Sequence, residues 1–443
     1  MLTVPKREVR ASDLGRTHRI FLLVLVSMGS SIIYTPPYLR YVFYDPMMKA
    51  LNVTNAELGM LTSAYALTAT ICYLPSGVLA DKIRVRTLGW VGFVTTALLT
   101  FWYALLPSFQ TLLLLFVGMG ITTILILLGI RFKLVRLISE EDEYSKNIGM
   151  SYGIYGAAGL VVGLINAWIV ASLASNLALA VSALLFVLGG IILLLGILTF
   201  LFVPKFAGEI ASGGKSSFNL NEVKKVLQTP VVWLAAGTMF FVYFFYTGVN
   251  YTTPYLQNAL GASLGVVTIV SVVRTYGITL LSGPIFGTIA AKAKSPSKVI
   301  LIGSVITCVA FGALIVLPQD AGMAVAAAAI IIALGFIANG VFGIVSSQLT
   351  EGRVPVTIFG TATGILSVVG FMPDTFSSAW FGSIMDAKGN AAYAEIFGIL
   401  IGSAVIAALF GLAVLLYVRK NAEKLDAIAA AAEAEATAAT SDA

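Results

Sequence analysis

The sequence has little charge and few side chains that could bind a metal. Only 11% of its 443 residues are charged, 58% are hydrophobic, and the mean hydropathy is +0.95. A water-soluble globule of this size does not need so apolar a composition. Cys72 and Cys308 lie far apart in apolar runs and the one histidine is His18, so neither a disulfide framework nor a metal site is indicated. We predict an integral membrane protein without metal or cofactor.

The excess of basic residues follows the short loops. Basic side chains precede the first apolar run, which is longer than the core of a signal peptide, so we expect a retained first helix. The formal charge of +6 is spread over loops between apolar runs rather than gathered on a polar domain, which argues against a nucleic-acid partner. Most Lys and Arg fall in loops on the side of the N-terminus. The pattern therefore predicts a multi-pass protein of the plasma (inner) membrane with both termini in the cytoplasm.

Apolar runs of membrane-spanning length fill the chain. A spanning helix needs roughly 20 mostly apolar residues. Breaks at charged or Gly/Pro-rich points predict twelve segments: 19–44, 56–80, 88–106, 110–136, 147–172, 176–203, 230–257, 263–290, 298–317, 321–348, 357–384 and 391–418. A polar stretch at 205–229 divides six from six. We predict an all-α fold of two six-helix bundles, 19–204 and 230–418, with a cytoplasmic loop at 205–229, a cytoplasmic N-terminus at 1–18 and a disordered tail at 419–443.

The two halves repeat each other in three places. The matched phrases are YTPPYL at 34–39 with YTTPYL at 251–256, GVLADK at 77–82 with GTIAAK at 287–292, and IGMSYGI at 148–154 with FGTATGI at 359–365. Each pair alone is weak, but they occur in the same order in both halves. The repeats indicate a duplicated six-helix unit related by pseudo-symmetry, with proline breaks at equivalent points of segments 1 and 7.

The loop GVLADKIRVR at 77–86 resembles the signature loop of the major facilitator superfamily. It has a glycine, a small spacer, an acid followed by a base, and further basic residues, although Ile83 and Val85 stand where Gly-Arg is usual. The resemblance covers essentially the whole chain and implies transport by alternating access rather than catalysis. It implies that Asp81 latches the cytoplasmic side near the start of segment 11. Arg84 and Arg86 either hold Asp81 in place or are ordinary basic residues of a cytoplasmic loop. The implied cytoplasmic gate comprises Gly77, Asp81, Lys82, Arg84 and Arg86.

Charged residues inside the membrane are costly and are therefore functional candidates. Arg274 is about eleven residues into segment 8, roughly 15 Å below its outer end, and is our strongest predicted substrate-binding residue. Asp374 follows Pro373 in segment 11. It either pairs with Arg274 or carries a coupling proton, and the sequence does not separate these roles from a structural pair.

Arg40 allows two interpretations. It can snorkel to the outer surface beside Tyr41 and Tyr44, or it can bind substrate, because the surrounding order loosely resembles the organophosphate:phosphate antiporter branch. That branch carries a partner arginine in segment 7 where this chain has Tyr246, which argues against exchange of inorganic phosphate.

Further candidates line the same predicted cavity. Arg131, Lys133 and Arg136 form a solvated flank at the inner end of segment 4, or Arg131 and Lys133 are cavity residues. Tyrosine hydroxyls can donate to an anion. The tyrosines predicted to bind substrate are Tyr34, Tyr38, Tyr246, Tyr251 and Tyr276. Tyr65 and Tyr255 can also supply hydroxyl donors to an anion in this cavity.

The favoured function is secondary active transport of a small organic anion such as a carboxylate, sugar acid or organophosphate, as symporter or antiporter with H⁺ or Na⁺ as a possible coupling ion, by a monomer in the bilayer. The alternative is a proton-coupled multidrug or neutral-solute transporter. Segment 5 has glycines but lacks the Gly-Pro motif of the multidrug exporters, and segment 1 lacks the acid usual in sugar porters. Nothing indicates a receptor, and no nucleotide loop or catalytic His/Cys arrangement indicates an enzyme.

Overall fold

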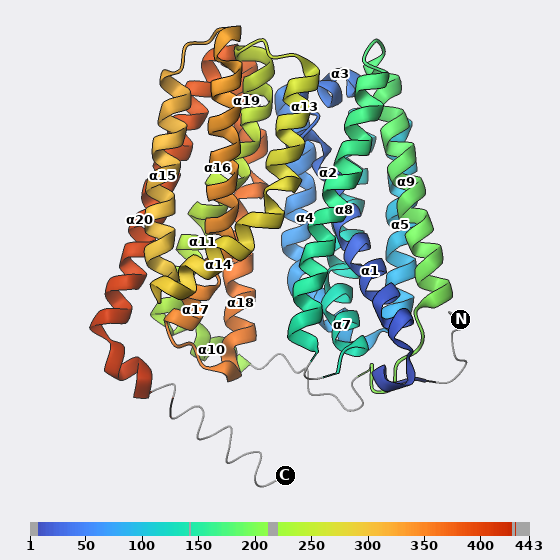
Figure 1. The fold of residues 1–443 in the computed structure, drawn as a ribbon, viewed down its shortest axis with the longest axis vertical. Helices are drawn as coiled ribbons and strands as arrows, with labels where there is room; N and C mark the ends of the chain where they lie inside the picture. The colour runs from blue at the N-terminus through green and yellow to red at the C-terminus, as the bar shows by residue number, and fades with distance from the viewer. Residues whose placement is uncertain (1–7, 141–142, 211–219, 428–429, 431–443) are drawn as a thin grey trace. The chain divides into compact units, whose positions relative to one another are not determined.

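The computed structural model describes residues 8–140, 143–210, 220–427 and 430, and every element labelled in Figure 1 is a helix. The described residues contain no β-strand, only one isolated parallel bridge between Val9 and Phe206. Most of the predicted tail and part of the predicted central loop lie outside the described residues. Arg419 and Lys420, at the start of that tail, still belong to the last long helix. The predicted all-α membrane fold is confirmed.

The helices have the length and composition of membrane spans. Within the described residues, nine helical stretches are long and apolar enough to cross a membrane, or eleven if each of two bent pairs is one span. One stretch, Ile358–Lys420, has 63 residues. A straight helix of that length would measure roughly 95 Å, about three times the hydrocarbon core, so it contains more than one crossing. It turns at Gly389, whose φ of +54° favours glycine. These counts are consistent with the twelve predicted segments.

The chain divides into two compact units. Their boundaries differ from a simple division of the sequence into an N-terminal and a C-terminal half. The first comprises Met1–Ser217, Ser263–Leu280 and Ser378–Asp386, and the second comprises Phe218–Ala262, Leu281–Ser377 and Ala387–Ala443. The first unit therefore includes pieces of predicted segments 8 and 11. The predicted division at 205–229 remains a prediction.

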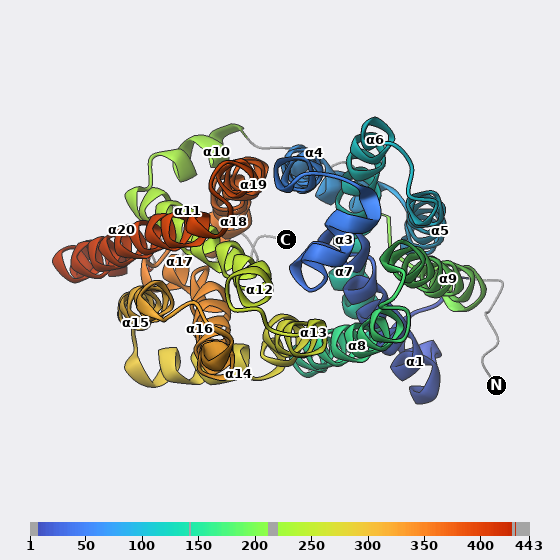
Figure 2. The same ribbon diagram turned by 90° about the horizontal axis from the view of Figure 1, so that it is seen from above.

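In the first unit, helices pack through small residues. Its helices are α1 (Arg16–Ile32), α2 (Thr35–Tyr38), α3 (Tyr44–Leu51), α4 (Asn55–Lys82), α5 (Val85–Ala104), α6 (Phe109–Gly120), α7 (Leu128–Ile138), α8 (Tyr144–Ser172), α9 (Leu177–Phe202), α13 (Leu264–Val272) and most of α19 (Ser377–Lys388). Helices α5 and α9 lie side by side in Figures 1 and 2. A Cβ on Gly89 would lie 2.7 Å from Thr199, and one on Gly189 the same distance from Phe101. Glycine thus permits this close approach.

Glycine also permits close helix packing in the second unit. Its helices are α10 (Leu220–Leu227), α11 (Pro230–Gly248), α12 (Thr252–Pro254), α14 (Thr279–Ala293) from Leu281 on, α15 (Pro296–Val316), α16 (Ala324–Ile344), α17 (Ser347–Glu351), α18 (Val356–Gly370) and α20 (Ala392–Lys420). Helix α20 packs along α11 and α15. A Cβ on Gly248 would lie 2.3 Å from Leu400, which explains why α11 carries glycine there.

Several spans depart from α-helical geometry. Helix α1 ends at Ile32 and the chain re-enters a helix at Thr35, with proline in its first positions. The second copy of the phrase passes through a 3-10 turn and then a π-helical turn, Tyr255–Ala259. The predicted breaks in both copies are confirmed. Two further π-helical turns, Ile121–Ile126 and Val273–Gly277, were not predicted.

Glu209 ties together chain segments at the end of the first unit where α4 stops. Its side chain is fully buried. The carboxylate accepts hydrogen bonds from the backbone N–H of Val85, at the start of α5, and of Phe206, 3.2 Å away. Arg84 Nη1 lies 3.7 Å from the same carboxylate. One acid therefore satisfies the free amide at a helix start and neutralises a nearby cation.

We expect Glu209→Ala to lower the free energy of unfolding by about 1–3 kcal/mol, because buried backbone donors lose their acceptor. The melting temperature of the purified protein in detergent measures this. Glu395→Ala, which removes an exposed ion pair with Lys388, serves as the control and should change stability by less than about 1 kcal/mol. Equal losses in the two variants would contradict a special role for Glu209.

Candidate functional site

Arg131 is buried inside the first unit. It lies on α7, directly after the π-helical turn Ile121–Ile126, and only 7% of its surface is exposed. Its Nε donates a hydrogen bond to Ser151 Oγ at 2.9 Å, and Ser27 Oγ donates to the same oxygen at 2.8 Å. The interpretation of Arg131 as a solvated flank is therefore wrong, and the cavity interpretation gains support.

Aromatic rings surround this guanidinium. Its Cζ lies 4.2 Å from the ring centre of Tyr152 and 5.0 Å from that of Tyr155, both on α8. Such contacts attract a cation through the ring quadrupole. The described part of the chain places no carboxylate in an ion pair with Arg131, and its Nη2 is buried without a hydrogen-bond partner. Tyr152 as a residue is 56% exposed, so it covers the guanidinium from an accessible side.

Lys133 does not join Arg131. Its Nζ donates to the backbone carbonyl of Ala80, which ties α7 to α4. The neighbouring Arg136 is exposed and lies over the ring of Tyr144, at 5.2 Å. The three basic residues that look alike in the sequence thus have three different environments.

One of the predicted tyrosines on the first span, Tyr34, lies near Arg131, and a second, Tyr38, lies against α4. Tyr34 is close enough to Arg131 and Tyr155 to interact with both electrostatically. The ring of Tyr38 lies 5.2 Å from that of Tyr65, whose hydroxyl is 2.9 Å from Thr123 in the π-helical turn of segment 4. The first span and α4 therefore add tyrosines to the same unit.

Arg40 and Arg274 converge on one residue. Each is only 4% exposed. The guanidinium of Arg40 lies 5.3 Å from the ring centre of Tyr41 and donates to Ser378 Oγ at 2.5 Å. Arg274 Nη2 donates to the backbone carbonyl of Tyr41 at 2.8 Å and to Thr275 Oγ1 at 3.1 Å. Arg40 does not snorkel to the surface, and the structure brings it together with Arg274.

Tyr276 packs into a glycine groove of α8. A Cβ on Gly159 or Gly163 would lie 2.8 or 2.9 Å from its ring. These glycines allow the outer part of segment 8 to approach α8 closely, and Arg274 sits two residues earlier in the same π-helical turn. Tyr276 therefore positions this turn.

Asp374 belongs to an aromatic cluster of the second unit. It is buried, and Tyr243 donates its hydroxyl hydrogen to Asp374 Oδ2 at 2.8 Å. The ring of Phe342 lies 5.5 Å from Tyr243 and stacks on Tyr246 at 4.7 Å. Tyr246 is therefore part of this cluster. Tyr251, also predicted, is buried in the 3-10 turn after α11.

Asn339 adds an amide beside these rings. Its Nδ2 donates to the Tyr246 hydroxyl at 3.3 Å, and its Oδ1 accepts from Ser282 at 2.7 Å. The second unit thus combines stacked aromatic rings, an amide and one buried acid, which is a less charged environment than that of Arg131.

The predicted gate residues are arranged differently from the expectation. Within the described residues Asp81 is exposed and forms no ion pair with Arg84 or Arg86. Arg84 instead pairs with Glu8 at 2.5 Å and with Glu209, while Arg86 lies over the ring of Phe200 at 4.9 Å. The expectation that these arginines hold Asp81 is wrong because nearer acidic and aromatic partners compete for them.

The two remaining gate residues lie at the surface. Lys82 is exposed, and a Cβ on Gly77 would meet nothing within 4 Å. The proposed contact of Asp81 with segment 11 stays a prediction.

At the opposite end of the first unit, the start of α4 is in close contact with α19. A Cβ on Gly59 would lie 2.1 Å from the carbonyl oxygen of Ser378. Asp386 accepts hydrogen bonds from the backbone N–H groups of Asn55 and Ala56, at 3.0 and 2.8 Å, and from the Asn55 side chain at 2.7 Å. Asp386 thus caps the start of α4 from a helix distant in sequence.

Sequence reasoning missed Ser151, Tyr152 and Tyr155 around Arg131, and Tyr243 beside Asp374. A signal for the first group existed, because Tyr155 is four residues after Ser151 and three after Tyr152 in a predicted helix, spacings that bring side chains together on the helix surface. Among the residues that the structure describes, no three His, Cys, Asp or Glu side chains lie close enough to hold a metal ion.

Comparisons with known proteins agree with this architecture. Residues 20–377 match the family model described as Major Facilitator Superfamily. Inner membrane protein YqcE of Escherichia coli (strain K12) is 30% identical over 365 residues, 81% of this chain and 85% of YqcE. One similar solved structure is a bacterial homolog of the human lysosomal transporter Spinster in an inward-facing and unoccupied conformation. It matches with a TM-score of 0.70 at 16% identity, and the match covers 90% of this chain and 98% of the Spinster homolog. The structure of nucleoside transporter NupG matches with a TM-score of 0.69 at 14% identity. This match covers 90% of this chain and 99% of NupG. The chain belongs to the major facilitator superfamily and has the fold of its secondary transporters.

Proposed function

We propose that this protein transports a small organic anion across the membrane by alternating access, and that Arg131 binds the anionic group. The observation that supports the proposal is the buried guanidinium of Arg131, whose Nη2 has no partner in the described residues. A buried charge without a counter-ion is costly. A carboxylate, phosphate or sugar acid reaching this position would supply the missing acceptor and form charge-assisted hydrogen bonds.

The buried charges of the first unit favour an anion over a cation. Arg40, Arg131 and Arg274 are buried there, against Asp45 and the structural acid Glu209. This balance gives the interior of the unit a positive potential, which attracts negative ligands and repels lipophilic cations. The proposed substrate class is thus supported by the buried charges rather than by the fold.

The residues around Arg131 have distinct proposed roles. Ser151 fixes the direction of the guanidinium through its hydrogen bond to Nε, so Nη2 remains the atom that meets the substrate. Tyr152, exposed on one side, moves away to admit the anion, and Tyr155 stays as the aromatic wall. Asp374 is the proposed site of a coupling proton, with Tyr243 donating to its charged form.

A second candidate is transport of a neutral, ring-containing solute. The stacked rings of Tyr246 and Phe342 with the nearby amide of Asn339 favour it, because such a site can stack on a ring and form hydrogen bonds without charge. The similarity in fold to NupG, a nucleoside transporter, points the same way. The overall surplus of buried arginine makes the anion the leading proposal.

Uptake into proteoliposomes by the purified protein tests both. The panel comprises monocarboxylates, sugar acids, organophosphates, nucleosides and lipophilic cations, with thermal shift as a second readout. A ligand at about 100 times its Kd should stabilise the protein by ~2.7 kcal/mol. The proposal expects at least one anion to be transported and to raise the melting temperature. Transport of nucleosides or cations without any response to anions would overturn it.

A further inference from the structure

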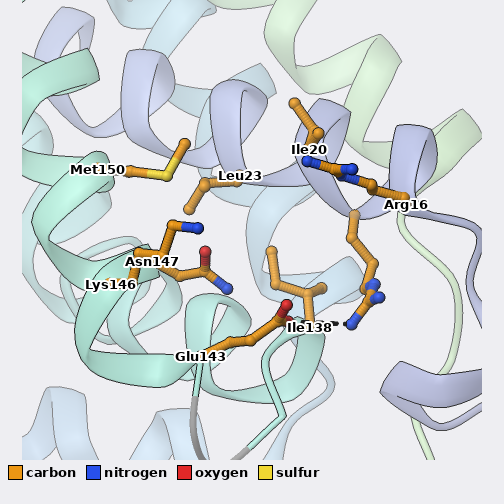
Figure 3. Close-up of a pocket in the computed structure, with 9 residues that line it drawn as sticks. Arg16, Ile20, Leu23, Ile138, Glu143, Lys146, Asn147 and Met150 are labelled. Carbon is orange, nitrogen blue, oxygen red and sulfur yellow. Dashed lines mark hydrogen bonds and ion pairs between the residues drawn. The ribbon is translucent and has the colours of Figure 1, made fainter.

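A separate cavity of about 160 Å³ opens near the start of α1 in the first unit. It lies between the first turns of α1, the end of α7 and the first turns of α8 (Figure 3), and its lining residue Ile138 is two helical turns after Arg131 on α7. Its lining residues are Arg16, Arg19, Ile20, Leu23, Ile138, Glu143, Lys146, Asn147 and Met150. None of these residues was predicted to have a function.

Cations dominate the rim of this cavity. Figure 3 shows Arg16 of α1 on one side and Lys146 of α8 on the other. Arg19 is already paired with Glu140 and Glu143, at 3.0 and 3.2 Å. Arg16 and Lys146 form no ion pair with any residue that the structure describes. Two positive charges therefore remain to meet a ligand, and the free N–H groups at the starts of two long helices add to the positive potential.

The remaining wall of the cavity is apolar. Leu23 and Ile138 are buried at its base. Ile20 and Met150 are 45% and 43% exposed beside the cations, on helices long and apolar enough to span the membrane. The cavity thus presents cations next to an apolar surface that is continuous with the sides of α1 and α8.

We propose that this cavity binds an anionic phospholipid, with Arg16 and Lys146 holding its phosphate and Ile20 and Met150 contacting its acyl chains. The charges fit a phosphate, and basic pockets between spanning helices near the membrane surface are suited to lipid head groups. A free phosphate would leave the exposed Ile20 and Met150 unused, so the apolar wall favours a lipid over a soluble anion. The lipid would bridge α1 and α8 at the end where both helices begin.

Native mass spectrometry and thermal shift of the full-length protein in detergent test the proposal. The probes are phosphatidylglycerol, cardiolipin, phosphatidylcholine and inorganic phosphate. We expect phosphatidylglycerol or cardiolipin to bind at least about tenfold more tightly than phosphatidylcholine, and inorganic phosphate to give no shift. Equal binding of the anionic and zwitterionic lipids would overturn the proposal, and an equal shift by inorganic phosphate would show a site for a soluble anion.

A charge-matched pair of variants locates the binding. Arg16→Gln with Lys146→Gln should weaken binding of the anionic lipid about tenfold or more. Lys292→Gln with Lys294→Gln removes two exposed positive charges from the second unit and should leave it unchanged. Unchanged binding in the first double variant would remove the lipid from this cavity. If the first double variant fails to fold, the wild-type protein still provides a test. Its binding of phosphatidylglycerol or cardiolipin relative to phosphatidylcholine shows whether a selective lipid site exists.

Discussion

Arg131→Gln is expected to reduce uptake of the transported anion about 100-fold or more while the protein still reaches the membrane. Loss of one partner of a buried charge pair costs about 2–5 kcal/mol in binding, and glutamine offers no positive charge to the substrate. Initial rates of uptake into proteoliposomes, compared at equal amounts of reconstituted protein, measure the effect. Arg131→Lys keeps the charge but loses the planar fork, so it should retain part of the activity.

Stability separates a binding role from a structural one. Because the guanidinium carries a cost of burial without an ion-pair partner in the described residues, removing it should leave the melting temperature of the substrate-free protein unchanged or raised. Arg136→Gln, on the same helix but exposed, is the matched control and should transport normally. Wild-type uptake by Arg131→Gln, or a large fall in its melting temperature together with the loss of uptake, would contradict the assignment.

Gly59→Leu is expected to block transport while leaving substrate binding intact. Any Cβ at this position lies 2.1 Å from the Ser378 carbonyl oxygen and 2.8 Å from the Ala379 nitrogen, and backbone atoms cannot rotate away as a side chain can. Overpacking typically costs about 1–3 kcal/mol, which would lower the population of the arrangement that joins α4 to α19 by roughly 5- to 150-fold. Alternating access needs each end of the pathway to close in turn.

The control for this variant is Gly190→Leu on α9, where a Cβ would meet nothing within 4 Å. Proteoliposome uptake should fall at least tenfold in Gly59→Leu and stay normal in Gly190→Leu. Thermal shift with the transported anion should show that Gly59→Leu still binds it. Normal uptake by Gly59→Leu would mean that closure at this end does not require the close contact with Ser378.

Hydropathy was sufficient to predict an all-helical protein with many membrane-spanning helices, because each span must cover a fixed thickness of hydrocarbon with apolar side chains. The same reasoning singled out Arg40, Arg274 and Asp374, whose charges stand out in long apolar runs and which are buried in the structure. It placed Arg131 ambiguously, because three basic residues near a helix end also occur where a helix simply leaves the membrane. Only the structure shows that Arg131 turns inward to Ser151 while Arg136 turns outward.

Contacts between distant segments were the least predictable part. Nothing in the sequence around Asp386 says that it caps the start of α4, because a cap from another helix has no fixed spacing. The partners of Arg84 were missed for the same reason, since Glu8 and Glu209 are far from it in sequence. Local sequence patterns predict the helices. The orientation of a charged side chain depends instead on the acidic or aromatic residue that lies nearest to it in the folded protein.

Because of the π-helical turn Ile121–Ile126, the orientation of Arg131 depends on the number of residues in this turn as well as on their types. Such a turn contains one residue more than an α-helical turn, so it rotates all that follows by roughly 100°. Losing any one residue from this stretch would swing Arg131 away from Tyr152 and Tyr155 with every side chain of the cluster unchanged. Relatives that share these residues but differ in length here are therefore expected to place a different residue of α7 against Tyr152 and Tyr155.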